Sequence, residues 1–240
     1  MPVASLPSDR AAVPAPGSGT CARLSRTGFC RLAPVYAFLE KIAFGRGLER
    51  VRFCLLGELR DCREILLLGE GDGRCLAQVL KVAPQARCHV VDSSPAMLQH
   101  AASRLAASDR VRVTFECADV LTWQPPHCRY DAVVSLFFLD CFEADDVRRL
   151  VDGLTRALRP GAKWVWADFV LPEKGPARWR AQGWLAVMYG FFRIVTQLPA
   201  RQLPPTENIL HRAGWRPAAV RQWPFIFARC AVYSQPGWGT

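Results

Sequence analysis

Three alternating glycines between two apolar runs constrain the fold of this chain more than any other feature. The stretch ILLLGEGDGRCLAQVL covers residues 65–80, and its glycines are Gly69, Gly71 and Gly73. The apolar run before the glycines predicts a strand, and the apolar spacing after them predicts a helix. Glycine allows backbone torsions that a side chain forbids, and it lets a ligand lie directly against the main chain. The turn therefore predicts a ligand site where a strand meets a helix.

The spacing of the glycines distinguishes between nucleotide-binding motifs. A dinucleotide fingerprint, GxGxxG, requires glycine at position 74, where the chain has Arg74, and no GK[ST] follows to make a P-loop. The motif is therefore GxGxG. Glu70 and Asp72 add negative charge beside the turn, which repels a pyrophosphate and suits a cationic ligand. A purely structural turn is the alternative interpretation.

Further apolar segments alternate with helical patterns along this chain of 240 residues, half of which are hydrophobic. Alternation over residues 111–119 suits a strand near a sheet edge, whereas the continuous apolar run at 130–140 suits a central parallel strand. Ser94 and Pro95 predict the N-cap and first residue of a helix. The strands expected from these patterns are EILLL, RCHVVD, VRVTFECAD, YDAVVSLFFLD and KWVWADF. Strands alternating with helices predict a doubly wound α/β sheet in one main domain.

The region before the first strand differs in composition. Residues 1–28 are rich in Pro, Ala, Ser and Gly and lack the apolar block of a secretory signal, so we expect a disordered N-terminal arm. Residues 29–60 predict a helical N-terminal cap with a break at Gly45 and Gly47. Residues 61–240 are expected to form the main domain.

Beyond Pro172 the strand–helix alternation stops. Residues 177–198 predict one long helix with aromatic residues around much of its circumference. Such a helix either covers the substrate pocket or meets a membrane or lipid-like acceptor, helped by Arg178, Arg180 and Arg193.

The last segments predict a short helix and a hairpin. Thr206 is expected to cap a helix that ends at Gly214, and WRPAAVRQW and FIFARCAVY predict a strand pair. Because Pro217 has no N–H to donate, the first of these strands must lie at an edge.

Composition weighs against several classes of protein. The formal charge is +10, but the arginines are scattered, which favours a solvated surface over contact with nucleic acid or acidic membranes. Ten cysteines, spread from Cys21 to Cys230 without a CxxC pair or metal-ligand spacing, predict reduced and mostly buried thiols and no metal. No run of apolar residues is long enough to cross a bilayer, so we expect a cytoplasmic protein.

Two carboxylates follow the strands next to the glycine turn. Asp92 ends the second predicted strand, where it can accept hydrogen bonds from ribose hydroxyls. Asp119 follows the third predicted strand and can face an adenine amino group. Each could instead be a helix cap or a turn residue. Together with the turn, they predict a nucleoside site.

These segments together resemble the class I S-adenosylmethionine-dependent methyltransferases. The matching motifs are LLLGEGDGR, VVDSSPAML, FECADV, YDAVVSLFFLDCF and LRPGAKWVWADF, in family order over about residues 60–170. The similarity is to the branch that acts on small molecules. It implies a Rossmann-like sheet of seven strands, mostly parallel with an antiparallel C-terminal hairpin, and S-adenosyl-L-methionine as cofactor.

The resemblance also implies a set of cofactor-binding residues on these motifs. They are Gly69, Glu70, Gly71, Asp72, Gly73, Asp92, Ser93, Met97, Asp119, Val120 and Leu136. The chain departs from many members at Leu67, where they carry an acidic residue two positions before the first glycine. The cofactor's amino group must then be oriented by another residue, such as Glu70 or Asp72.

Polar residues at the ends of the fourth and fifth strands are the candidates for catalysis. Asp140 could accept a proton from an acceptor hydroxyl or position the cofactor, and its alternative role is a helix cap. Asp168 is the second candidate, with a surface turn as its alternative. Tyr36 on the leading helix and Tyr189 on the aromatic helix could close over the site or belong to the core. His211 is expected to be structural.

The resulting function is methyl transfer to a small, hydrophobic or aromatic acceptor. Nucleic-acid amino-methyltransferases usually carry Asn or Asp with two prolines and an aromatic residue after strand four, whereas this chain has FFLD there, which argues against DNA or RNA. Two alternatives stay open. One is a non-catalytic interaction protein that binds adenosyl ligands, and the other is a nicotinamide-dependent oxidoreductase.

Overall fold

The computed structural model describes residues 47–171, 175, 179, 183 and 203–235. The expected N-terminal arm lies outside the described residues, and so does the expected cap up to residue 46. Tyr36, Tyr189 and most of the expected aromatic helix also lie outside them.

A single mixed sheet organises the described part of the chain. Its order is β3-β2-β1-β4-β5-β7-β6, in which the first five strands run parallel and β7 is antiparallel to both of its neighbours. The strands are β1 (Glu64–Leu68), β2 (Arg87–Asp92), β3 (Val113–Cys117), β4 (Tyr130–Leu136), β5 (Leu158–Phe169), β6 (Arg216–Trp223) and β7 (Ala228–Ser234). This confirms the seven-stranded sheet with an antiparallel C-terminal hairpin.

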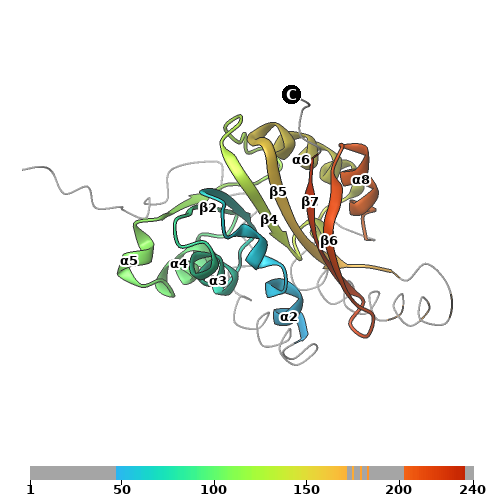
Figure 1. Ribbon diagram of the computed structural model, residues 1–240, viewed down its shortest axis with the longest axis horizontal. Coiled ribbons are helices and arrows are strands. Elements are labelled where there is room, and N and C mark those ends of the chain that lie inside the picture. Colours follow the sequence, from blue (N-terminus) through green and yellow to red (C-terminus); the bar gives the residue numbers. More distant parts are fainter. Residues whose placement is uncertain (1–46, 172–174, 176–178, 180–182, 184–202, 236–240) are drawn as a thin grey trace, which may run out of the picture.

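Helices cover both faces of the sheet (Figure 1). They are α2 (Gly47–Phe53), η1 (Leu56–Leu59), α3 (Arg74–Val82), α4 (Pro95–Ser103), α5 (Ala107–Arg110), η2 (Leu139–Cys141), α6 (Ala144–Ala157) and α8 (Thr206–Arg212). No helix in this part of the chain is long and apolar enough to span a membrane.

Alternate residues of the central strands contribute to two separate hydrophobic cores, one on each face of the sheet. In β1, Ile65 and Leu67 join the core that α2, α3 and α4 cover. Leu66 and Leu68 join the opposite core, which α6 and α8 cover. Because successive side chains of a strand point to opposite faces, an uninterrupted apolar run is what a strand between two helical layers requires.

The two edges of the sheet are as the sequence predicts. β3 is partly exposed along its length, and β6 is largely exposed and holds Pro217. By contrast β4 is buried along nearly its whole length between β1 and β5. The expected third strand began at Val111, but Val111 precedes β3 and is 81% exposed.

Several element boundaries differ from the expected ones. β4 ends at Leu136 instead of continuing to Asp140, because Phe137 adopts a positive φ of 54° that breaks the extended backbone. Helix α6 ends at Ala157, and β5 begins at once and runs through the Pro-Gly pair that was expected to lie before the strand. A register shift between Tyr130 and Ala132 accommodates the extra length.

Of the two N-cap residues predicted from the sequence, Ser94 is confirmed and Thr206 is wrong. Ser94 caps α4, accepting a hydrogen bond from the Met97 N–H at 3.4 Å, and Pro95 is its first residue. Thr206 does not cap α8. It is the first helical residue and is buried, and Pro205 precedes it without a side-chain hydrogen bond.

Candidate functional site

The carboxyl ends of the parallel strands meet where the strand order changes direction. β1 is hydrogen-bonded to β2 on one side and to β4 on the other, and the loops after these strands diverge to opposite faces of the sheet. Open α/β folds bind their ligands in the crevice formed at this point. The glycine turn follows β1 at this position.

The three glycines of the turn face different surroundings. All have positive φ, between 59° and 82°. A Cβ on Gly69 would lie 2.1 Å from the Phe138 ring, and one on Gly73 would lie 2.7 Å from Cα of Ala101 in α4. A Cβ on Gly71 would meet no described atom within 4 Å. The main chain at Gly71 is therefore open to a ligand that approaches it directly.

Both acidic residues of the turn bind groups of the protein. Glu70 accepts a hydrogen bond from the Leu76 N–H at 2.7 Å, and burial raises the pKa of Glu70 to about 8. Asp72 pairs with Arg74, at 2.7 Å between Oδ2 and Nε, and with Arg104 at 3.4 Å. Much of the negative charge expected beside the turn is therefore neutralised within the protein.

Asp92 joins the ends of β1 and β2. Its Oδ1 accepts a hydrogen bond from the Ser94 N–H at 2.8 Å, and the Gly71 N–H also donates to this carboxylate. Burial raises the pKa of Asp92 to about 6, and the two N–H donors oppose that shift. The open backbone at Gly71 and this carboxylate therefore lie side by side.

The residues after Asp92 position helix α4. Ser93 is exposed, and its carbonyl oxygen accepts from the Cys117 Sγ at 3.7 Å, which connects the ends of β2 and β3. Met97 is 8% exposed in the first turn of α4. Its backbone N–H is the group that Ser94 caps. Ser93 and Met97 thus lie on either side of the start of α4.

Asp119 makes the turn that follows β3. Its Oδ1 accepts from the Leu121 N–H at 3.0 Å, and its carbonyl oxygen accepts from the Thr122 and Trp123 N–H groups. Asp119 therefore has the role of a turn residue, which the sequence left open as an alternative. The next residue, Val120, is buried in the core beneath α6.

Asp168 is 1% exposed near the end of β5 and supports the loop after β4. Its Oδ1 accepts from the Phe138 N–H at 3.2 Å, its Oδ2 accepts from the Trp166 Nε1–H at 2.5 Å, and the Asp140 N–H also donates to it. The alternative of a surface turn is therefore wrong. Asp168 is a buried acceptor that fixes the backbone of residues 138–140.

Asp140 lies beside Asp168, in η2. It is 6% exposed, and the Cys141 Sγ lies 3.7 Å from its Oδ1. Burial raises the pKa of Asp140 to about 6. For Asp168, burial and then the neighbouring Asp140 charge raise the pKa well above its usual value, against the three N–H donors. Two buried carboxyl groups therefore lie next to one another where β4 and β5 end.

Aromatic residues precede and follow these carboxyl groups in the chain. Phe137 packs against Phe169 with ring centroids 5.0 Å apart, and Phe138 packs edge-on against Phe142 at 5.1 Å. Leu136, the last residue of β4, is 9% exposed and belongs to the core below α3. The end of β4 is thus apolar except for the carboxyl pair.

Arg52 on α2 is a site residue that the sequence reasoning missed. Its Cζ lies 5.2 Å from the centroid of the Phe137 ring. Its charge lowers the pKa of both Glu70 and Asp140 against the larger effect of burial. The helical pattern of the cap was the available signal, but nothing local in it distinguishes this arginine from its neighbours.

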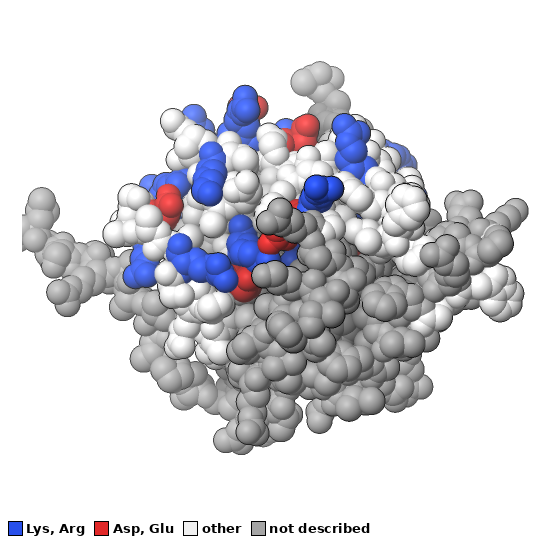
Figure 2. Space-filling view, turned by 90° about the horizontal axis from the view of Figure 1, so that it is seen from below, with Lys and Arg blue, Asp and Glu red and all other residues white. Residues whose placement is uncertain are grey.

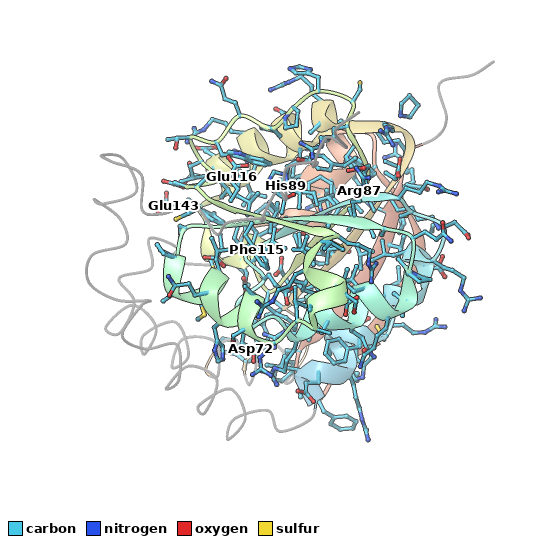
Figure 3. The ribbon with its side chains drawn as sticks, turned by 90° about the vertical axis from the view of Figure 1, so that its left-hand side faces the viewer. Asp72, Arg87, His89, Phe115, Glu116 and Glu143 are labelled. Carbon is cyan, nitrogen blue, oxygen red and sulfur yellow. The ribbon has the colours of Figure 1, made fainter. Side chains whose placement is uncertain are left out.

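A second cluster of hydrogen-bonded side chains, centred on the buried His89, lies away from the glycine turn. His89 Nδ1 lies 2.6 Å from the Tyr130 hydroxyl, its Nε2 lies 2.9 Å from Glu116, and the Trp123 Nε1–H donates to Glu116 at 2.8 Å. Figure 3 shows His89 and Glu116 together and Asp72 well separated from them. These contacts hold the segment that begins with Asp119 against the sheet.

The remaining sequence candidates include Tyr36 and His211. Tyr36 lies outside the described residues, so its role stays a prediction. His211 is exposed on α8, with its ring 6.2 Å from that of Tyr233. Within the described ranges, no group of three or more His, Cys, Asp or Glu side chains is arranged to hold a metal ion.

On the face drawn in Figure 2, the charged side chains of the described residues are mixed in sign but mainly basic. Figure 2 looks onto the side that lies lowest in Figure 1, and on its described part Lys and Arg side chains outnumber Asp and Glu. This agrees with the formal charge of +10.

Comparison with known proteins shows that the chain is similar to methyltransferases. The model of a methyltransferase domain family matches residues 65–161, from β1 into β5. Among curated proteins, the human tRNA N(3)-cytidine methyltransferase METTL6 is 28% identical over 136 residues, which are 52% of this chain and 47% of that protein. The chain therefore spans about half the length of the curated relatives it matches.

Solved structures share the fold at low identity. An O-methyltransferase family protein from Burkholderia thailandensis superposes with a TM-score of 0.65 and 16% identity, over 87% of this chain and 61% of that one. Human N-acetylserotonin methyltransferase, solved in complex with SAM, gives 0.61 and 15% over 86% of this chain and 57% of that one. These similarities establish a common fold.

Proposed function

We propose that this protein, whose residues 65–161 form a class I S-adenosylmethionine-dependent methyltransferase domain, transfers a methyl group to a small hydrophobic or aromatic acceptor. The cofactor supplies an activated methyl group on a sulfonium sulfur. The observation that carries the proposal is the open main chain of Gly71 beside the Asp92 carboxylate.

We assign the binding of the cofactor's nucleoside to the residues after β1, β2 and β3. The bare backbone at Gly71 leaves room for the ligand, and the Asp92 carboxylate accepts hydrogen bonds from the ribose hydroxyls. Asp119 and Val120 face the adenine, and Ser93, Met97 and Leu136 line its surroundings. Gly69 and Gly73 hold the turn in place through their close contacts with Phe138 and Ala101.

The end of β4 and β5 is assigned to the reacting groups. Methyl transfer is an in-line displacement, so the protein mainly has to align the acceptor and exclude water. The rings of Phe137, Phe138 and Phe142 favour an apolar acceptor. Asp140, whose burial raises its pKa to about 6, accepts the proton of an acceptor hydroxyl, and Asp168 fixes the loop that carries it.

Three further proposals rest on the sequence alone. Tyr36 is proposed to close over the acceptor, and the segment at residues 177–198 is proposed to cover the pocket or to contact a membrane peripherally. A cytoplasmic location is proposed from the cysteine usage of the chain.

An RNA acceptor is the second candidate function. It is favoured by the curated relatives, which are named as methyltransferases of a tRNA cytidine, and by the basic charge of the chain. The sequence FFLD after β4 argues against it, because the motif usual in nucleic-acid amino-methyltransferases is replaced there.

The decisive experiment combines binding with turnover on one full-length preparation. S-adenosylhomocysteine at a hundred times its dissociation constant is expected to add about 2.7 kcal/mol of stability. Methyl transfer from S-adenosylmethionine is then measured on a panel of small aromatic hydroxyl and amino compounds and on unmodified tRNA transcripts.

The outcomes separate the candidates. Methylated aromatic product supports the proposed function, and methylated tRNA alone supports the second candidate. Binding without turnover on either class of acceptor supports a non-catalytic adenosyl-ligand-binding protein. Stabilisation by a nicotinamide dinucleotide in preference to S-adenosylhomocysteine supports an oxidoreductase.

A further inference from the structure

Two cysteines from distant parts of the chain lie together beside α2. Cys54 follows the last residue of α2 and is exposed, whereas Cys230 lies in β7 and is buried. Helix α2 packs against β7, and the Cys54 and Cys230 side chains are close enough for each to influence the pKa of the other. The Cys54 thiol also donates a hydrogen bond to the carbonyl oxygen of Val51 at 3.2 Å.

The sheet register independently places Cys230 on the side where Cys54 lies. Arg221 of β6 is directly opposite Cys230 of β7, so their side chains project from the same face. That face carries the core to which Val51 and Leu55 contribute together with Cys230. Cys54, between these two residues, therefore lies over the strand pair that holds Cys230 and Arg221.

The surroundings give the two thiols different reactivity. The hydrogen bond from Cys230, together with the charge of Arg221, lowers the pKa of Cys54 against the effect of burial. The same hydrogen bond, and then burial, raise the pKa of Cys230. The exposed Cys54 thiol, whose pKa is lowered, thus lies next to the buried Cys230 thiol, whose pKa is raised, which is the arrangement of an attacking and a resolving cysteine.

We propose that Cys54 and Cys230 form a redox site that a peroxide converts reversibly into a disulfide. The Cys54 thiolate attacks one oxygen of hydrogen peroxide, so an S–O bond forms, the O–O bond breaks, and the departing hydroxide becomes water on taking a proton. The Cys230 sulfur then attacks the Cys54 sulfenic acid. An S–S bond forms, the S–O bond breaks, and the hydroxide leaves as water with the Cys230 proton.

The electrons balance in this sequence. Two thiols and one hydrogen peroxide give one disulfide and two waters, and the two sulfurs lose the two electrons that the peroxide gains. A dithiol reductant reverses the step. The bond would tie the end of α2 to β7, and α2 carries Arg52, whose guanidinium lies over Phe137 at the end of β4.

The other described cysteines provide the comparison. Of the eight free cysteines in the described ranges, Cys54 and Cys128 are classed as exposed. Cys128 precedes β4, on the opposite end of the sheet from the glycine turn. Cys128 is therefore the matched control: it is exposed like Cys54, but it lies far from the Cys54–Cys230 pair.

The test is peptide mapping of the full-length protein. It is treated with a small excess of hydrogen peroxide, blocked with N-ethylmaleimide, digested with trypsin and analysed by mass spectrometry. Cleavage after Arg52, Arg60 and Arg229 releases FCLLGELR, which holds Cys54, and the C-terminal peptide that starts at Cys230. We expect these two peptides to be cross-linked and to separate after reduction with dithiothreitol.

Variants assign the roles of the two thiols. Cys230→Ser should lose the cross-link and leave a sulfenic acid on Cys54 that dimedone traps, Cys54→Ser should lose both, and Cys128→Ser should change neither. If Cys230→Ser does not fold, the wild-type protein still gives the answer. Its Cys54 should then react with maleimide at least several-fold faster than its Cys128 at neutral pH.

Specific results would overturn the proposal. One is oxidation of Cys128 by peroxide while Cys54 and Cys230 both stay open to maleimide. Another is a Cys54 sulfenic acid that persists in the wild-type protein without a cross-link to Cys230. Neither readout depends on methyl transfer, so this test is independent of the proposed function.

Discussion

The Phe138 ring occupies the space that a side chain on Gly69 would need. A Cβ at residue 69 would lie 2.1 Å from Cδ2 of Phe138 and 2.6 Å from Cε2. Gly69 also has a φ of 59°. The turn after β1 and the loop after β4 are therefore fitted against one another, and these are the two segments between which the ligand crevice of the fold opens.

This packing predicts that Gly69→Ala destabilises the protein. The positive φ and the contact with Phe138 should together lower the free energy of unfolding by about 2–4 kcal/mol. Gly57→Ala is the control, because a Cβ there meets no described atom within 4 Å and its φ is not positive. Urea denaturation measures both variants. Equal stability of the two would show that Phe138 does not pack on residue 69.

The same contact predicts coupling between the two residues. Adding Phe138→Ala to Gly69→Ala should destabilise by clearly less than the sum of the single effects, because the ring that clashes is removed. Additive effects in the double-mutant cycle would contradict the contact.

Gly71→Ala should separate ligand binding from stability. Its φ of 69° makes alanine strained by about 1 kcal/mol, but the added Cβ would meet no atom of the described residues within 4 Å. Gly214→Ala carries the same kind of strain, at a φ of 89° and with the same open surroundings, beyond α8. We expect similar losses of stability from both variants.

Their affinities for S-adenosylhomocysteine should differ. Calorimetric titration is expected to show at least a tenfold loss for Gly71→Ala, because the methyl group occupies the ligand's approach to the main chain. Gly214→Ala should bind as the wild type does. Equal affinities in the two variants would remove Gly71 from the binding site.

The fold could be predicted from periodicity because each strand and helix is buried on the face that its pattern indicates. The apolar run of β4, the alternation of β3 and Pro217 in β6 each correspond to a definite place in the sheet. The boundary at Leu136 could not be predicted. It depends on Phe137, whose positive φ is held by packing against Phe169 and Arg52, neither of which is local in sequence.

The place of the candidate site in the fold could be predicted from the sequence, but the electrostatics of its residues could not. The glycine spacing and Asp92 mark the ends of β1 and β2, where local pattern and topology agree. The partners of Asp72 were not predictable, because Arg104 reaches it from a different helix. The burial of Asp168 beneath the loop after β4 likewise depends on the pairing of β4 with β5.

Asp168→Ala should be among the most destabilising single changes in the described part of the chain. Its carboxylate accepts from the Phe138 and Asp140 N–H groups and from Trp166 Nε1, and each buried donor left without an acceptor costs about 1–3 kcal/mol. Chemical denaturation is expected to show a loss of about 3 kcal/mol or more.

Two other variants test the cause of that loss. Asp168→Asn keeps one carbonyl acceptor at nearly the same volume, so it should destabilise less than Asp168→Ala. Asp152 is exposed on α6, and Asp152→Ala should change stability by less than about 0.5 kcal/mol. Asp168→Ala with the stability of Asp152→Ala would contradict the buried hydrogen bonds.

Affinity for S-adenosylhomocysteine should depend on pH through Asp92. Burial raises the pKa of Asp92 to about 6, and the ionised carboxylate is the form that accepts hydrogen bonds from the ribose hydroxyls. Binding must therefore displace a proton below this pKa. Calorimetric titrations should show a constant affinity above about pH 7 and a fall of nearly tenfold per pH unit below about pH 5.

Asp92→Asn tests this assignment with a stability readout of the opposite sign. The folded pKa of Asp92 lies above its unfolded value of 3.8, so its contribution to stability is complete below that value and is lost as the pH rises through about 6. The asparagine variant should therefore bind the ligand weakly, with little pH dependence, and yet be more stable than the ligand-free wild type at neutral pH.

Asp140→Asn, which changes the other carboxyl group with a pKa near 6, should retain the wild-type pH slope of binding. A slope that follows Asp140 instead of Asp92 would reassign the titrating group.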